Sequence, residues 1–311
     1  MRKKTWRWRG FEVSVPLPTR PAPDPSRLSP EELIQDGPIP ELRTVSRQES
    51  IKKFDEGINE LRSYADARPE REAATSLADR VTAMYWYHTI ELPGGVVTGG
   101  MNDHRALVPS YGIPDDLKGK RVLDVGTWDG FWAFEFERRG AEVKAVDLDR
   151  FSRVDVPAAY RRRIESSGFD YVYGEGFEVA KNALGSKVDR IERNIYDLNP
   201  DDLGTFDLVH VADVLLHLEF PTRALQAVRS VTGGQAMLIM TFDPDLEGAG
   251  GHVVRYLGGW ADTIWWIPSL RTNAQMILDA GFSSVRLHKT YRLVSLDGGT
   301  PLWRAVFFAQ P

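Results

Sequence analysis

The pattern of hydrophobic and polar positions changes near residue 120. From there on, short aliphatic runs alternate with helical stretches, which is typical of βαβ units and of a parallel sheet covered on both faces. The predicted strands are Arg121–Val125, Glu142–Asp147, Arg190–Asn194, Phe206–Ala212, Ala236–Phe242, Ser284–Val294 and Trp303–Ala309, and the predicted helices are Phe131–Arg139, Phe177–Leu184, Pro221–Ser230 and Pro268–Ala280. The last two strands have no helix long enough to lie between them, so we expect them to pair as an antiparallel hairpin.

The residues before this part divide into two further segments. Residues 1–45 form a proline-rich arm, in which Trp6, Trp8 and Phe11 alternate as an edge strand would. Residues 46–117 are expected to be a helical lid region, with one helix after Ser46 and a second over Glu72–Trp86. The lid would bring Trp86–Leu92 across the mouth of a cleft in the third segment, residues 118–311.

Composition and charge narrow the range of functions. The chain has 311 residues and no cysteine, which excludes disulfides, thiolate zinc sites and cysteine nucleophiles. A net charge of −5 gives no general attraction to nucleic acid or to anionic membranes. No apolar run approaches the roughly eighteen residues of a membrane span, and no signal peptide is recognisable. We therefore expect a cytoplasmic protein.

The segment Val122–Trp132 ends a strand in a glycine turn and opens a helix, an arrangement that exposes backbone N–H groups. A dinucleotide fingerprint would need glycine where Trp128 stands, and a P-loop would need lysine where Phe131 stands. The remaining pattern, D-x-G-x-x-x-G, suits S-adenosylmethionine. Asp124 would orient the loop and the methionyl ammonium, while Gly126 and Gly130 would let the backbone approach the methionyl moiety.

Asp147, at the end of the second strand, would accept both ribose hydroxyls as a bidentate carboxylate. Its neighbour Leu148 and the loop residues Thr127 and Trp128 are predicted to line the same cofactor site.

This segment resembles motif I of the class I S-adenosylmethionine-dependent methyltransferases, and residues 118 to 310 fit that family's order of strands and helices. The resemblance implies a Rossmann-like α/β fold, with a seven-stranded sheet whose last strand is antiparallel and, in this chain, an N-terminal helical extension. It also implies that Asn194 accepts a hydrogen bond from the adenine amino group and that Ile195 packs on the adenine ring.

A narrower resemblance points to the tRNA wobble-uridine carboxymethyltransferase branch. The run Trp86–Thr98, the segment Val214–Leu218 and the ending Trp303–Val306 are similar to it. Arg304 matches an arginine that this branch uses to hold a carboxylated cofactor, but Leu216 and the Tyr87–Thr89 segment replace two other partners of that carboxylate. Plain S-adenosylmethionine is therefore the expected cofactor.

Candidate catalytic residues follow the fourth and fifth strands, because ligands of open α/β sheets bind beyond the carboxyl ends of the strands. Asp213 and His217 follow the fourth strand, and His252 lies in a glycine-rich segment after the fifth. His217 is the first candidate for a general base because imidazole titrates near neutral pH. Asp213 is also expected to contact the cofactor.

His88, His217 and His252 belong to segments expected at one cleft, and three imidazoles could hold a divalent metal such as zinc or iron. Such a metal could chelate a 2-oxo acid and stabilise its enolate.

The function we predict is methyl transfer from S-adenosylmethionine to an oxygen, nitrogen or acidic carbon of a small molecule. An RNA methyltransferase of the wobble-uridine type is one alternative, supported by the basic N-terminus and by Arg161–Arg163. The other is a non-catalytic S-adenosylmethionine-binding module. The pattern leaves the acceptor and the oligomeric state open.

Overall fold

The computed structural model of the chain describes residues 3–8, 11–16, 48–68, 73–259, 263–292 and 302–311. Two compact units follow one another along the chain, Met1–Ser46 and Arg47–Pro311, and each is considered by itself. In the first unit β1 (Lys3–Trp8) pairs antiparallel with β2 (Phe11–Pro16). The alternation of Trp6, Trp8 and Phe11 therefore predicted extended structure correctly. The residues form a two-stranded hairpin, not a single edge strand. The proline-rich stretch over residues 17–47 lies outside the described residues.

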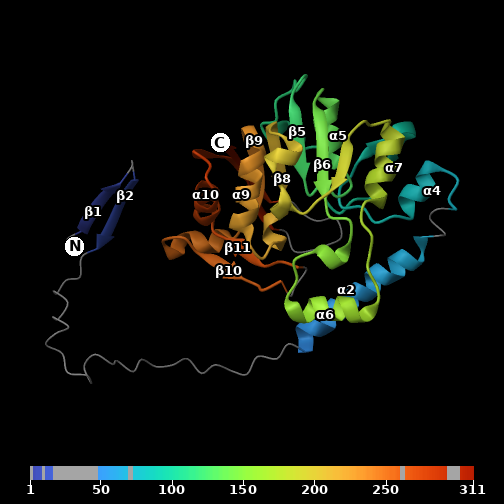
Figure 1. Ribbon diagram of the computed structural model, residues 1–311, viewed down its shortest axis with the longest axis horizontal. Helices are drawn as coiled ribbons and strands as arrows, with labels where there is room; N and C mark the ends of the chain where they lie inside the picture. The colour runs from blue at the N-terminus through green and yellow to red at the C-terminus, as the bar shows by residue number, and fades with distance from the viewer. Residues whose placement is uncertain (1–2, 9–10, 17–47, 69–72, 260–262, 293–301) are drawn as a thin grey trace. The chain divides into compact units, whose positions relative to one another are not determined.

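A seven-stranded sheet forms the centre of the second unit, in the order β12-β13-β9-β8-β5-β6-β7 (Figure 1). Its strands are β5 (Arg121–Val125), β6 (Glu142–Asp147), β7 (Asp189–Glu192), β8 (Phe206–Ala212), β9 (Thr232–Phe242), β12 (Ser284–Arg292) and β13 (Trp303–Gln310). Strands β5 to β9 pair in parallel, whereas β13 is antiparallel to both β9 and β12. The predicted sheet and its terminal hairpin are confirmed.

Helices cover both faces of this sheet (Figure 1). The helices are α5 (Phe131–Arg138) and α7 (Glu175–Leu184) on one face, and α8 (Pro200–Leu203), α9 (Pro221–Val231) and α10 (Leu270–Asp279) on the other. Adjacent strand residues alternate between the two cores, so that Val122 faces one and Leu123 the other, and both side chains are fully buried. Burial on both faces explains why the strands are continuous aliphatic runs.

The lid region contains less helix than predicted. Helix α2 (Gln48–Asp66) was expected, but the predicted helix over Glu72–Trp86 was wrong in extent, because α4 covers only Leu77–Thr82. Ser76 caps its first turn, and the helix ends where Trp86 turns back to donate its indole N–H to the Val81 carbonyl at 3.0 Å. Burying the Trp86 ring in the core takes precedence over continuing the helix.

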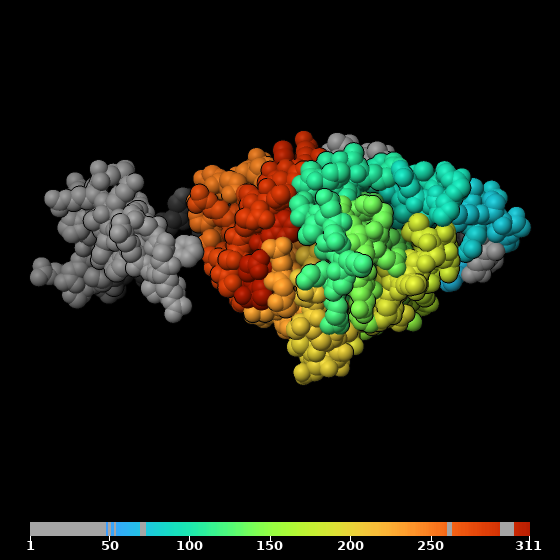
Figure 2. Space-filling view, turned by 90° about the horizontal axis from the view of Figure 1, so that it is seen from above, coloured from blue at the N-terminus to red at the C-terminus, as the bar shows by residue number. Residues whose placement is uncertain are grey.

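After α4 the chain runs through a short hairpin, β3 (Glu91–Leu92) and β4 (Val96–Val97), and reaches the sheet beside its C-terminal strands. Lys289 on β12 donates to the hydroxyl of Ser110 at 2.7 Å. In the space-filling view the segment before β5, coloured teal, and the C-terminal strands, coloured red, lie side by side on one surface (Figure 2).

Besides the short elements α8, β3 and β4, one helix and two strands were not predicted. Helix α6 (Ala158–Ser167) contains three consecutive arginines that obscure its apolar stripe, and it packs against α2, where Phe54 stacks on Tyr160 with ring centroids 3.8 Å apart (Figure 1). Strands β10 (Val254–Tyr256) and β11 (Trp266–Pro268) pair antiparallel after β9. Each of these two strands has only three residues, too few for a period-2 pattern to be recognised.

Candidate active site

The predicted cofactor residues gather at one edge of the sheet. Strands β5, β6, β7 and β8 run parallel, so their carboxyl ends lie at the same edge, where an open α/β sheet binds its ligands. Each strand is followed by predicted cofactor residues: the glycine loop after β5, Leu148 after β6, Asn194 and Ile195 after β7, and Asp213 after β8.

Both loop glycines are required by the backbone and by packing. Gly126 has a φ of +76°, and a Cβ on it would lie 2.3 Å from Val214 Cγ2. Gly130 has a φ of +89°, and a Cβ there would lie 2.4 Å from Phe134 Cε2. A side chain at either position would therefore strain the backbone and collide with a neighbour. These positions need glycine in the protein itself, before any ligand is considered.

The turn between the glycines is held by Asp147. One carboxylate oxygen accepts from the Trp128 backbone N–H at 2.7 Å, and the other accepts from the Leu148 N–H, also at 2.7 Å. Trp128 has a φ of 50°, a conformation that non-glycine residues adopt rarely. Burial raises the pKa of Asp147 to about 6, although the Trp128 hydrogen bond and Arg190 oppose the shift.

Asp124 is not exposed at this edge, and only one of its two carboxylate oxygens has a hydrogen-bond partner among the described residues. It is buried inside the sheet, 1% exposed, and its Oδ1 lies 2.7 Å from Nδ1 of His210 on the adjacent strand. Its position fits support of the strand beneath the loop, and the expected role toward the methionyl ammonium stays a prediction. His210, which the pattern placed inside a strand, is fully buried.

The remaining cofactor candidates also have defined partners. The Asn194 side-chain oxygen accepts from the Tyr196 N–H at 3.1 Å and keeps a second lone pair for a ligand. Ile195 is buried beside it, and the hydroxyl of Thr127, inside the glycine loop, is buried without a hydrogen-bond partner. An unsatisfied hydroxyl in this loop is consistent with a ligand that completes the site.

Asp129, which the sequence analysis did not single out, fastens the lid region to the glycine loop. Its Oδ2 accepts from the backbone N–H groups of Tyr87 and His88 at 3.0 and 2.7 Å, and its Oδ1 lies 2.5 Å from His88 Nδ1. Asp129 is 2% exposed. The segment Trp86–Leu92 is thereby fixed beside Trp128, whose ring centroid lies 6.1 Å from that of Tyr87.

Asp213 is paired rather than free. The Arg304 Nε donates to its Oδ2 at 2.5 Å, and both side chains are largely buried, with exposures of 11% for Asp213 and 9% for Arg304. Asp213 has a φ of 51°. Burial and the Asp213 carboxylate raise the pKa of Tyr87 above its usual range, so the Tyr87 hydroxyl keeps its proton at neutral pH. Tyr87 from the lid region, Asp213 after β8 and Arg304 on β13 thus form one largely buried polar cluster.

The predicted metal site is not formed. His88 is bonded to Asp129, the Nδ1 of His217 lies 3.1 Å from the Thr263 hydroxyl, and His252 is exposed on the segment before β10. Across the described part of the chain, no group of three or more His, Asp or Glu side chains is placed to hold a metal. The prediction was wrong because belonging to neighbouring segments does not make three side chains point the same way.

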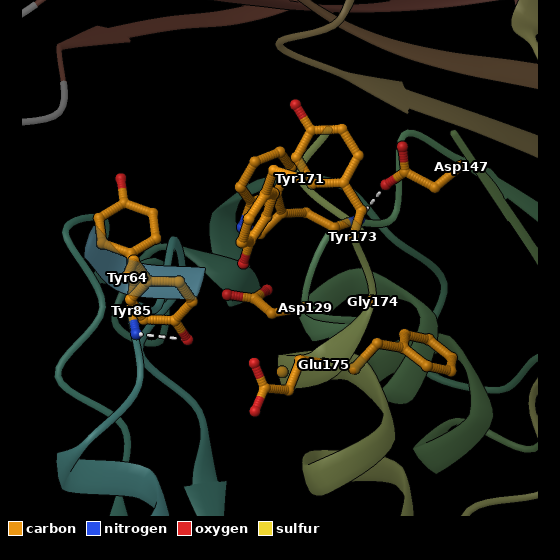
Figure 3. A pocket seen from close by; sticks show the side chains of 11 residues that line it. Tyr64, Tyr85, Asp129, Asp147, Tyr171, Tyr173, Gly174 and Glu175 are labelled. Carbon is orange, nitrogen blue, oxygen red and sulfur yellow. Dashed lines mark hydrogen bonds between the residues drawn. The ribbon is translucent and has the colours of Figure 1, made fainter. Parts of the chain in front are cut away.

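A pocket opens beside the glycine loop (Figure 3). Its walls come from the end of α2, from the glycine loop and from the connection that leads into α7. Aromatic rings and carboxylates line it, namely Tyr64, Tyr85, Trp128, Tyr171, Tyr173 and Phe177 together with Asp129, Asp147 and Glu175. The two tyrosines of the connection, spaced by two before a glycine, were a signal that the sequence analysis did not use.

The arginine cluster of α6 is mostly engaged within the protein. Arg161 donates to the carbonyl oxygens of Ser152 and Val154, and Arg163 pairs with Asp55 of α2. Of the three, Arg162 is exposed and has no side-chain contact of this kind with another described residue, so the cluster is weak support for binding of a nucleic-acid backbone. No described helix is long and apolar enough to cross a membrane.

Comparison with known proteins agrees with this geometry. The methyltransferase domain family matches residues 104–287, more than half of the chain, and the chain therefore belongs to that family. In fold it is similar to the N-terminal domain of EvdMO1, crystallised in the presence of S-adenosylhomocysteine and D-fucose, at a TM-score of 0.50 and 15% identity, over 79% of this chain and 97% of that one.

Two curated relatives are similar over a shorter stretch. The magnesium-protoporphyrin O-methyltransferase of Rhodobacter capsulatus is 29% identical over 40% of this chain and 45% of its own. The ubiquinone biosynthesis O-methyltransferase of Xanthomonas euvesicatoria pv. vesicatoria is 30% identical over 40% of this chain and 44% of its own. The chain thus spans less than half the length of these relatives. The comparisons support the class I methyltransferase fold but not the narrower wobble-uridine branch.

Proposed function

We propose that the chain transfers a methyl group from S-adenosylmethionine to a small-molecule acceptor. The observation that carries this proposal is the position of Asp147, whose carboxylate ends β6 at the pocket and is bonded to the backbone of the glycine loop. An acid at this point of the fold suits a ligand with two adjacent hydroxyls, as a ribose has. The family match and the relatives named as O-methyltransferases favour transfer to oxygen.

The character of the pocket supports S-adenosylmethionine over an anionic cofactor. Three carboxylates and several aromatic faces line it. A sulfonium and an ammonium group are attracted by such walls, whereas a pyrophosphate would be repelled by them. The Trp128 side chain also occupies the side of the loop where a dinucleotide fingerprint needs glycine.

Within this proposal the chain's residues bind, orient and exclude water. S-adenosylmethionine supplies an activated methyl group, so the protein needs to position the acceptor and to accept a proton from it. Asp147 would hold the ribose, Asn194 and Ile195 the adenine, and Tyr87 would cover the reacting end beside Asp213 and Arg304.

The proton acceptor we propose is His217, which lies between β8 and α9 beside Thr263. Asp213 is less suited to that task, because its charge is already compensated by Arg304. His252 is exposed on its segment and is a weaker candidate than either. Enolate chemistry of a 2-oxo acid loses its main support with the metal site, and an oxygen acceptor is preferred.

Isothermal titration calorimetry with S-adenosylmethionine tests the proposal. The Asp147→Ala change should cost about 1.5–3 kcal/mol of binding, the contribution of hydrogen bonds to a charged group. Asp189→Ala is the matched control, because Asp189 begins β7 at the opposite edge of the sheet and pairs there with Lys144. Equal affinities of wild type and Asp147→Ala, or no binding to either, would contradict the assignment.

A further inference from the structure

Arg190 on β7 extends toward the edge of the sheet that carries the proposed cofactor site. Strands β6 and β7 pair in parallel with Ala145 opposite Arg190, so the two residues lie on the same face. Asp147 shares this face, because it follows Ala145 by two residues. The Arg190 side chain reaches the end of β6, where its Nη2 donates to the Leu148 carbonyl oxygen at 3.1 Å.

The guanidinium group of Arg190 lies against the wall of the pocket beside the glycine loop. Gly174 has a φ of +100°, and a Cβ on it would lie 3.1 Å from Arg190 Cζ, so a side chain there would press on the guanidinium. Arg190 Cζ also lies 5.8 Å from the centroid of the Phe177 ring. Gly174 and Phe177 line the pocket together with Asp147 (Figure 3). The positive charge is therefore fixed close to the pocket without lining it.

The ionisable groups around Asp147 act on its charge in opposite directions. Burial and the Asp124 carboxylate on β5 raise the pKa of Asp147, whereas the Trp128 hydrogen bond and the Arg190 charge lower it. Burial and the Asp147 charge together raise the pKa of Tyr173, which precedes α7. The same pocket is lined by two further acids, Asp129 and Glu175. A positive charge beside this acidic wall favours the ionised form of Asp147, which can accept two hydroxyl hydrogen bonds.

We propose that Arg190 is a positioning residue of the cofactor site, which holds the turn Asp147–Leu148 and keeps the Asp147 carboxylate ionised for a ligand with two adjacent hydroxyls. The proposal rests on the proposed function, because it assigns the support of the same ribose site. Arg190 acts through the Leu148 carbonyl and through its charge. The Leu148 N–H in turn donates to Asp147 Oδ1 at 2.7 Å, so the held turn also fixes the carboxylate.

Two substitutions separate the charge of Arg190 from its hydrogen bond. In Arg190→Gln the amide can still donate to the Leu148 carbonyl but carries no charge, whereas Arg190→Lys retains a donor and the charge. Arg138→Gln is the matched control. Arg138 is exposed at the C-terminal end of α5, away from the glycine loop that precedes this helix, and it pairs there with Glu135.

Nuclear magnetic resonance of ¹³C-labelled aspartate carboxyl groups measures the titration of Asp147 in the protein without ligand. The Asp147 signal is identified by its absence from Asp147→Asn. In Arg190→Gln its midpoint should rise by about one pH unit, as expected when a nearby opposite charge is lost. The midpoint should stay near the wild-type value in Arg190→Lys and in Arg138→Gln. A purely structural role of Arg190 would not move the midpoint in this way.

Calorimetry with S-adenosylmethionine measures the consequence for the cofactor. At about pH 5 the affinity of Arg190→Gln should be about tenfold below that of the wild type, because a rise of one unit in the pKa leaves about tenfold fewer carboxylates ionised. At about pH 8.5 the two affinities should agree, since Asp147 is then ionised in both proteins.

A measurement on the wild type keeps the test valid if Arg190→Gln does not fold. The guanidinium ¹⁵N signals of Arg190, assigned through its backbone, should shift with pH at the same midpoint as the Asp147 carboxyl signal. Different midpoints, or an unchanged Asp147 midpoint in folded Arg190→Gln, overturn the role of Arg190 even when S-adenosylmethionine binds. Absence of S-adenosylmethionine binding at every pH, with the Asp147 midpoint shifted in Arg190→Gln, overturns the proposed function and leaves the coupling of the two residues standing.

Discussion

Removing the Asp129 carboxylate should release the lid region from the glycine loop. In Asp129→Ala the buried N–H groups of Tyr87 and His88 lose the oxygen that now accepts both, and His88 Nδ1 loses its partner at 2.5 Å. Each donor left unpaired costs about 1–3 kcal/mol, so the two backbone N–H groups alone give an expected loss of stability of roughly 2–6 kcal/mol. Local opening of the segment to water limits the loss to the lower part of that range.

Asp129→Asn gives a graded comparison. Its amide oxygen can still accept from both backbone N–H groups, and its NH₂ can face the imidazole when the His88 proton is on Nε2. We expect a loss of about 1 kcal/mol, typical of a single hydrogen bond. Asp115→Ala is the control, because Asp115 is fully exposed and Arg139 keeps its contacts with Glu135 and the Ile113 carbonyl, so a loss of about 0–1 kcal/mol is expected.

Urea denaturation measures the change in stability, and amide hydrogen exchange at Tyr87 and His88 measures the release itself. Both amides should lose protection in Asp129→Ala, keep most of it in Asp129→Asn, and be unchanged in Asp115→Ala. Retained protection in Asp129→Ala together with an unchanged denaturation midpoint would refute the role assigned to this carboxylate.

Three further predictions follow from the site. Burial raises the pKa of Asp147 to about 6, and only the ionised carboxylate accepts both ribose hydroxyls. Calorimetry should therefore show the affinity for S-adenosylmethionine falling about tenfold per pH unit below that pKa, and a flat profile would exclude this role. Gly126→Ala places a methyl group 2.3 Å from Val214 Cγ2, so calorimetric unfolding should show the stability of the fold reduced by about 1–3 kcal/mol. Gly185→Ala, at a helix end with open space around it, should reduce the stability by less. Treatment with a chelator should leave cofactor binding and methyl transfer intact, and activity restored only by added metal would contradict the separation of His88, His217 and His252.

The centre of the sheet was predictable because its strands are buried on both faces. The limits of β5, β6 and β8 were predicted as observed, and those of β7 and β13 to within two residues. Strand β9 begins four residues earlier than predicted, at Thr232, because its first residues include two glycines that carry no hydrophobic signal. Helix α6 was missed for a related reason, since its arginines obscure the buried Tyr160 and Ile164.

Of the candidate site, only the part near the glycine loop could be predicted from the sequence. The loop is one short motif after β5, and Asp147 follows from its place at the end of the next strand, β6. The partners of Asp129 lie 41 and 42 residues earlier in the chain, and Arg304 is 91 residues from Asp213, so no local pattern predicts these contacts. The metal prediction failed at the same step, because the direction of a side chain is set by tertiary packing.

The packing of α2 on α6 has a consequence for turnover. These helices share a small core of their own, formed by Ile58, Phe151, Val156, Tyr160 and Ile164, apart from the two cores that flank the sheet. Elements with a core of their own can open as a cooperative unit while the rest stays folded. Tyr64, near the end of α2, lines the pocket that holds Asp147, so such opening would uncover the proposed cofactor site. The stability of this small core would then set how fast spent cofactor leaves, independently of how tightly the sheet edge binds it.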